Sequence, residues 1–241
     1  MTGSNQWAIE LEGEEADRVV WKEALTPPGD PYVEEVDAVG GTTLALRATA
    51  FGNCDAPGEV RAIAVELFRT ISGVMAILHR ADTVTPGPVI DLEGEGSPKR
   101  HYFINLEAGH IRLRGGSVNL IIRDAEGNVV ESPSADSETQ EWMRAATLCP
   151  GIAETIGYLH GSSDWGELYK AYETLRDMGL ARDAITSTQR TLFTRSANTE
   201  DRHRKGKFDP PTNPMPLREG RTLMERWLAA AITEWLLANP R

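Results

Sequence analysis

A basic segment near the C-terminus, Arg190 to Arg221, contains the residue types best suited to bind and cleave a phosphodiester. It holds eight arginine and lysine residues against four acidic ones, a local excess of four positive charges in a chain whose formal net charge is -11. Arginine binds phosphate oxygens through a bidentate fork, and histidine exchanges protons near neutral pH. The segment is therefore the leading candidate for an anion-binding site.

Two kinds of residue make up this candidate site. The candidate catalytic residues are Arg195, which would stabilise the charged transition state, and His203, which would act as acid or base. The candidate anion-binding residues are Arg190, Asn198, Arg202 and Arg204. A helix that ends near Arg195 and is followed by a polar loop can direct these groups at one anion. Such chemistry uses no metal ion, and no cofactor is expected.

Other interpretations of the basic residues stay open. The segment from 199 to 214 is equally typical of a solvated loop between two helices, and a basic patch can bind phosphate or RNA without cleaving it. A second anion site is conceivable on adjoining strands, whose members are Arg100, His101, His110, Arg112 and Arg114. Alternating arginines are also what the water-facing side of a sheet shows, so this second site ranks below the C-terminal one.

Composition excludes several classes of protein. The net charge of -11 argues against a protein that coats DNA, because such binding depends on neutralising phosphates. Cys54 and Cys149 fit neither a metal-ligand spacing nor a disulfide scaffold, which favours a reducing, cytoplasmic location. No apolar run reaches the ~20 residues of a membrane span. The glycine-rich phosphate loop, the nucleophile elbow and the zinc-protease helix are absent from the sequence.

Hydrophobic patterning predicts an α+β fold with antiparallel strands in the N-terminal half. Strand-like alternation marks residues 7–13, 18–25 and 42–51, and helical spacing marks Glu59 to His79. One short strand is expected within residues 85–100. A β meander is expected over residues 101–132. This mixed region occupies residues 1–131, and the polar stretch from Ser132 to Gln140 marks its boundary.

Residues 132–241 are expected to form an all-α helical bundle. Short helices are predicted over 137–150 and 151–161, and the strongest helix prediction covers residues 164–179. There Asp164 is the N-cap and Gly179 the C-terminal stop. Residues 181–196 are expected to continue as a helix, and the last helix runs from Leu217 to Ala238. Trp227 and Trp235 are expected in its core, although their separation also suits a dimer face.

The bundle resembles the HEPN superfamily, whose all-α domains carry an arginine followed shortly by a histidine near a helix end. The similarity covers Ser137 to Arg241, and Asn198 is a polar residue of the kind often seen after the motif arginine. Seven residues, SANTEDR, separate Arg195 from His203, whereas the family motif has four to six. The resemblance implies a metal-independent ribonuclease, or a binding module that has lost catalysis, in a bacterial toxin or defence system.

Three functional hypotheses follow. The first is an RNA- or phosphate-binding effector module, and the second is metal-independent RNA cleavage at Arg195 and His203. The third is a non-catalytic structural protein that forms a homodimer through its last helix. In the first two, the expected partner is RNA or another anionic ligand. No membrane partner is expected.

Overall fold

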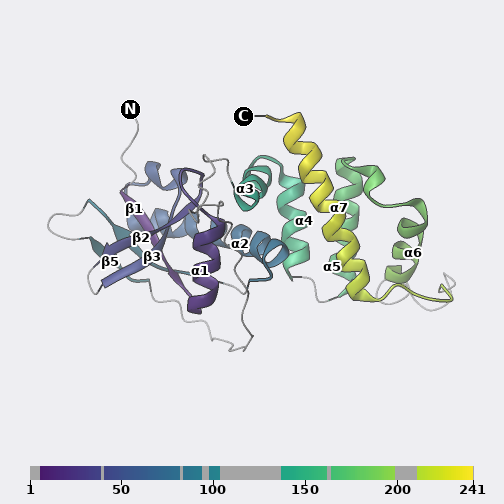
Figure 1. The fold of residues 1–241 in the computed structure, drawn as a ribbon, viewed down its shortest axis with the longest axis horizontal. Coiled ribbons are helices and arrows are strands. Elements are labelled where there is room, and N and C mark those ends of the chain that lie inside the picture. Colours follow the sequence, from purple (N-terminus) through teal and green to yellow (C-terminus); the bar gives the residue numbers. More distant parts are fainter. Residues whose placement is uncertain are drawn as a thin grey trace, which may run out of the picture. The chain divides into compact units, whose positions relative to one another are not determined.

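The computed structural model describes residues 6–38, 41–81, 84–93, 98–103, 137–161, 164–198 and 211–240. It shows the predicted α+β fold, with antiparallel strands in the N-terminal half and a helical C-terminal half (Figure 1). The predicted boundary between residues 131 and 132 lies outside the described residues. Most of the predicted meander also lies outside them, because residues 104–136 are not described.

The described N-terminal elements are five strands and three helices. The strands are β1 (Trp7–Glu12), β2 (Tyr32–Ala38), β3 (Gly41–Arg47), β4 (Thr85–Asp91) and β5 (Lys99–His101). The helices are α1 (Glu15–Ala24), the short 3-10 helix η1 (Thr49–Asn53) and α2 (Pro57–Leu78). The helix predicted over Glu59 to His79 and the strand predicted within residues 85–100 are thereby confirmed.

The described elements from residue 138 onward are all helical. They are α3 (Glu138–Leu148), α4 (Pro150–Gly161), α5 (Trp165–Met178), the 3-10 helix η2 (Arg182–Ala184), α6 (Ser187–Ala197) and α7 (Leu217–Ala238). No helix among the described residues is long and apolar enough to cross a membrane.

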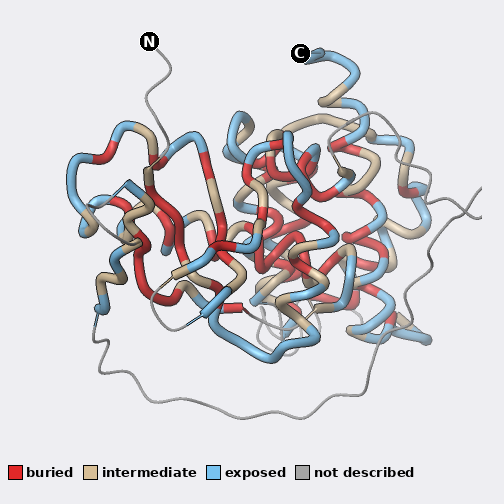
Figure 2. Tube along the Cα trace, turned by 60° about the vertical axis from the view of Figure 1, so that its left-hand side comes forward, coloured by how far each residue is buried: buried red, intermediate tan, exposed pale blue. Residues whose placement is uncertain are grey.

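Contacts divide the chain into two compact units. The first contains residues 1–68 and 83–140, and the second contains residues 69–82 and 141–241. The divisions therefore fall within α2, between residues 82 and 83, and within α3. In both units, buried and exposed stretches alternate along the helices and strands (Figure 2), as expected of elements that each bury one face.

The first unit is built on a five-stranded sheet in the order β2-β3-β1-β4-β5, in which all neighbours are antiparallel. Because side chains alternate between the two faces of a strand, Ile9 and Leu11 of β1 share one face, and Ala8 lies on the other. All three are buried. Helix α1 contacts β2, and its Trp21 lies against Phe68 of α2 with ring centroids 5.2 Å apart.

Helix α1 corrects the strand-like interpretation of residues 18–25. Val19 and Val20 favour a strand locally, but Trp21, Ala24 and Leu25 recur at helical spacing, and all three are buried. Tertiary burial outweighed the local preference of two β-branched residues. Strand β2 was not predicted, because its acidic residues obscure the apolar alternation of an edge strand that pairs on one side with β3.

In the second unit, α7 packs against α4 and α5, which also contact each other (Figure 1). Trp227 of α7 is 1% exposed and its indole nitrogen donates to the carbonyl oxygen of Leu180 at 3.0 Å. Trp227 is therefore core and is not available to a second copy of the chain, as the dimer face would require. Trp235 is half-buried.

Candidate functional site

Helix α6 is positioned by signals at its N-terminus. The Thr186 hydroxyl accepts from the Gln189 backbone N–H at 3.2 Å, and the Gln189 side chain accepts from the Thr186 backbone N–H at 3.0 Å. This reciprocal cap satisfies two backbone donors that the first turn would leave unpaired. The continuous helix predicted over residues 181–196 is therefore wrong over residues 181–186, where η2 and the extended Ile185 precede α6.

Aromatic packing fixes α6 against its neighbours. The ring of Phe193, which is fully buried, lies 5.4 Å from the rings of Trp165 and Tyr172 on α5. Tyr172 in turn contacts Trp227 of α7 at 5.9 Å. Gly220 of α7 approaches this cluster so closely that a Cβ there would stand 2.9 Å from Trp165. Helix α6 is thus a rigid support for the side chains on its outer face.

A hollow of about 400 Å³ lies along that outer face. The side chains that line it are Ser187, Thr188, Thr191, Leu192 and Arg195. These positions are one, four, five and eight residues beyond the first, so they fall on one side of the helix. Three hydroxyls and one exposed guanidinium therefore face the same space. Hydroxyl and guanidinium groups are common ligands of phosphate oxygens.

Arg190 does not line this hollow. It stands five residues before Arg195, which at about 100° per residue places it roughly 140° away around the helix. Its guanidinium donates to the Arg182 carbonyl oxygen at 3.0 Å and lies over the Trp227 ring, 5.9 Å from the centroid. The described residues therefore give Arg190 a packing role between α6 and α7.

The other candidate residues fall at or beyond the end of α6. Asn198 is half-buried, and its backbone N–H bonds the carbonyl oxygens of Ser196 and Thr194. Arg202, His203 and Arg204 lie outside the described residues. The predicted pairing of Arg195 with His203 therefore stays a prediction.

Ser196 is a buried residue that sequence reasoning missed. Its hydroxyl oxygen accepts from the Met215 backbone N–H at 2.8 Å, which joins the chain before residue 199 to the chain after residue 210. The described chain on either side of positions 199–210 is thus joined one residue after Arg195. The sequence did contain a signal for this contact: a serine on an otherwise apolar helix face, shortly before a proline-rich stretch.

A second cluster of charged residues surrounds Glu225 of α7. Arg80 donates to both of its carboxylate oxygens at 3.1 and 3.0 Å, and Arg221 donates at 3.0 Å. Burial raises the pKa of Glu225, but the hydrogen bonds from the two arginines outweigh it and lower the pKa overall. Burial and the charge of Arg221 lower the pKa of His160 on α4. The hydrogen bonds of the cluster join α7 to the chain after α2, and His160 of α4 lies close enough to Arg221 to feel its charge.

The alternative anion site on the sheet has two described members. Arg100 forms an ion pair with Glu10 at 2.9 Å, and His101 meets the edge of the Trp7 ring with centroids 6.3 Å apart. Both contacts join β5 to β1 across the intervening β4, which is the structural interpretation of these residues. His110, Arg112 and Arg114 lie outside the described residues.

Within the described ranges, no three histidine, cysteine, aspartate or glutamate side chains gather in a way that would hold a metal ion. Comparisons with models of protein families, with curated proteins and with solved structures found no match. The function must therefore be argued from the site itself.

Proposed function

We propose that the second unit binds RNA through its phosphate groups at the outer face of α6. The observation that carries the proposal is the hollow in which Arg195 and the hydroxyls of Ser187, Thr188 and Thr191 face one space of about 400 Å³. A guanidinium supplies charge and a directional fork, and hydroxyls adapt their donors to the remaining oxygens.

The distribution of charge supports this choice of unit. The first unit has 9 basic and 22 acidic residues, a net charge of -13, whereas the second has 16 basic and 14 acidic residues, a net charge of +2. Phosphate contacts supply most of the affinity of a protein for nucleic acid. A polyanion is therefore repelled by the first unit and tolerated by the second.

The flanking basic segment supports the same location. Arg202, Arg204, Lys205 and Lys207 belong to residues 199–210, whose two flanks meet at the contact between Ser196 and Met215. Ser196 follows Arg195 directly in the chain. The chain is thus joined across positions 199–210 one residue after Arg195, which supports one extended anionic ligand over an isolated phosphate.

A binding titration tests the proposal. A fluorescently labelled single-stranded RNA is titrated with the full chain in EDTA at low salt, and its anisotropy is recorded. Replacing Arg195 with glutamine removes one charge-assisted contact, and the dissociation constant is expected to rise about tenfold. The matched control is Arg176→Gln on α5, which removes the same charge from an exposed residue paired with Asp177.

The outcome of the titration discriminates among the hypotheses. Equal affinity of the Arg195→Gln and Arg176→Gln proteins would overturn the proposal. The same samples run on a denaturing gel test for catalysis, because the RNA stays intact if the unit only binds. Cleavage that is lost in both Arg195→Ala and His203→Ala would instead support the metal-independent ribonuclease that the HEPN resemblance implies.

A further inference from the structure

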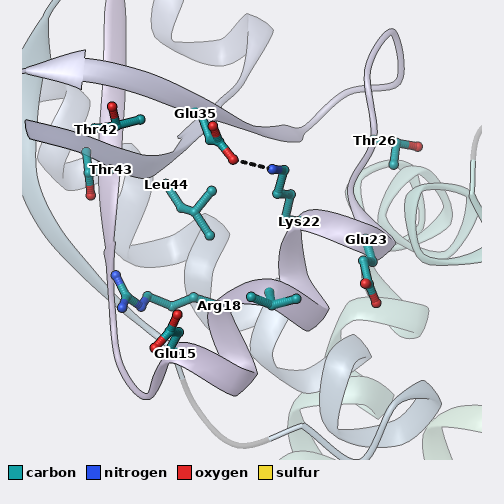
Figure 3. A pocket seen from close by; sticks show the side chains of 10 residues that line it. Glu15, Arg18, Lys22, Glu23, Thr26, Glu35, Thr42, Thr43 and Leu44 are labelled. Atoms are coloured by element: carbon teal, nitrogen blue, oxygen red, sulfur yellow. Dashed lines mark hydrogen bonds and ion pairs between the residues drawn. The ribbon is translucent and has the colours of Figure 1, made fainter. Parts of the chain in front are cut away.

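A groove of about 700 Å³ lies in the first unit, between α1 and the end of the sheet formed by β2 and β3 (Figure 3). Its volume falls within the range of small-molecule sites, which combine an apolar surface with a few placed polar groups. Here the apolar surface comes from Val19, which is 36% exposed, and from the half-buried Leu44.

Some of the charged groups that line the groove are ion-paired, and others are not. Lys22 and Glu35 form an ion pair at 2.5 Å that joins α1 to β2. Arg18 and Glu15, one helical turn apart on α1, form no ion pair with any residue that the structure describes. The Nε atom of Arg18 is buried without a hydrogen-bond partner in the same part of the chain. Among the described residues, the groove therefore contains one cation and one anion, Arg18 and Glu15, that have no ion-pair partner.

These two groups point toward the same end of the groove. Figure 3 shows the Arg18 guanidinium and the Glu15 carboxylate next to each other at the lower left, whereas the ion pair of Lys22 with Glu35 stands apart from them, near the top centre. The Thr42 hydroxyl, on the same face of β3 as Leu44, already donates to Asp37 at 2.7 Å. The Thr43 hydroxyl donates to Glu10 at 2.9 Å on the opposite face of the strand, so Arg18 and Glu15 are the charged groups left to the ligand.

We propose that this groove binds an α-amino acid with a bulky apolar side chain. Arg18 receives the carboxylate of the ligand as a guanidinium fork. Glu15 accepts from its ammonium group. The apolar side chain of the ligand packs on Val19 and Leu44, and the volume of the groove suits an aromatic ring.

Electrostatics favours a zwitterion over a simple ion. The first unit carries a net charge of -13, which disfavours the approach of an anion. A simple cation would satisfy Glu15 but leave the guanidinium of Arg18 without a partner. A neutral molecule with adjacent charges of both signs avoids the long-range repulsion and pairs both groups.

Calorimetric titration of the full chain tests the proposal with three probes. L-phenylalanine carries both charged groups, L-phenylalaninamide lacks the carboxylate, and N-acetyl-L-phenylalanine lacks the ammonium. We expect L-phenylalanine to bind about tenfold or more tightly than either blocked analogue, because each analogue loses a charge-assisted contact. No binding of L-phenylalanine, or equal binding of all three probes, would overturn the proposal.

Two variants assign the charged contacts. Arg18→Gln is expected to abolish the preference for L-phenylalanine over its amide, and Glu15→Gln the preference over the N-acetyl analogue. Both residues lie on the surface of α1, and circular dichroism checks that the helix is retained. Lys170→Gln in the other unit is the control and keeps both preferences. If either groove variant also keeps both preferences, the assigned contacts are wrong and the proposal fails.

Discussion

At the scale of single residues, Glu225 shows how a carboxylate is kept ionised inside a helical unit. Its side chain is about 10% exposed, a position at which an unpaired charge is costly. Two arginines donate three hydrogen bonds to its two oxygens. Because those bonds favour the charged form, the pKa of Glu225 lies below its ordinary value in spite of burial.

Replacing Glu225 with glutamine is expected to destabilise the protein by roughly 1–3 kcal/mol at pH 7, since both arginines lose their charged partner. A group whose folded-state pKa is lowered stabilises the fold above its unfolded pKa of about 4.3. That stability is lost as the pH falls through the folded pKa. The difference between wild type and variant, measured by urea unfolding, should therefore shrink below about pH 4.

The matched control is Glu154→Gln on α4, an exposed position, for which little change is expected. A Glu225→Gln protein as stable as wild type at pH 7 would contradict the assigned role of Glu225. A stability difference between wild type and Glu225→Gln that is as large at pH 3 as at pH 7 would also contradict that role.

His160 gives a second dependence on pH, in a different range. Its pKa is lowered by burial and by Arg221, so the folded protein resists a proton that the unfolded chain accepts below about pH 6.5. The unfolding free energy should therefore fall as the pH drops from 6.5 toward the folded pKa. A His160→Gln protein is expected to show a flatter profile between pH 7 and 5.5 in urea titrations. A profile with the wild-type slope would show that His160 is not responsible.

At the scale of elements, local signals predicted the ends of α5 and α7. The Asp164 cap, with Glu167 N–H to carboxylate at 2.9 Å, and the left-handed Gly179 at φ 74° bound α5 as expected. The helix predicted from Leu217 to Ala238 has those bounds in the structure. Helix ends of this kind depend on capping residues within a few positions of each other, so they can be predicted from the sequence.

Features that depend on distant residues were not predictable. Helix α1 was obscured because the burial of Trp21 depends on Phe68 of α2. The contact of Glu225 with Arg80 spans 145 positions. In the candidate site, the end of α6 near Arg195 was predicted. The contact of Arg190 with the Trp227 ring was not predicted, because it depends on where α7 packs.

The reciprocal cap of α6 gives a prediction at this scale. Thr186→Ala removes the hydroxyl that accepts from the Gln189 N–H, and a loss of about 1 kcal/mol in the unfolding free energy is expected. Thr233→Ala on α7 is the control, because the Thr233 hydroxyl only bonds the carbonyl one turn earlier in its own helix. Urea unfolding measures both, and equal stability of the two variants would argue against a cap at Thr186.

At the scale of the whole molecule, charge is distributed unevenly, with -13 on the first unit and +2 on the second. The excess of acid in the first unit accounts for the net charge of the chain. A neutral or zwitterionic ligand suits the first unit, and a polyanion suits only the second. The net charge of -11 therefore conceals two units with different electrostatic preferences.

The salt dependence of RNA binding tests the central claim, that Arg195 neutralises a phosphate, most directly. For single-stranded nucleic acid, each neutralised phosphate adds about 0.7 to the slope of log K against log salt concentration. In KCl titrations, Arg195→Gln is expected to reduce the magnitude of that slope by about 0.7 relative to wild type, and Arg176→Gln to leave it unchanged. A slope that is the same in all three proteins would contradict the account.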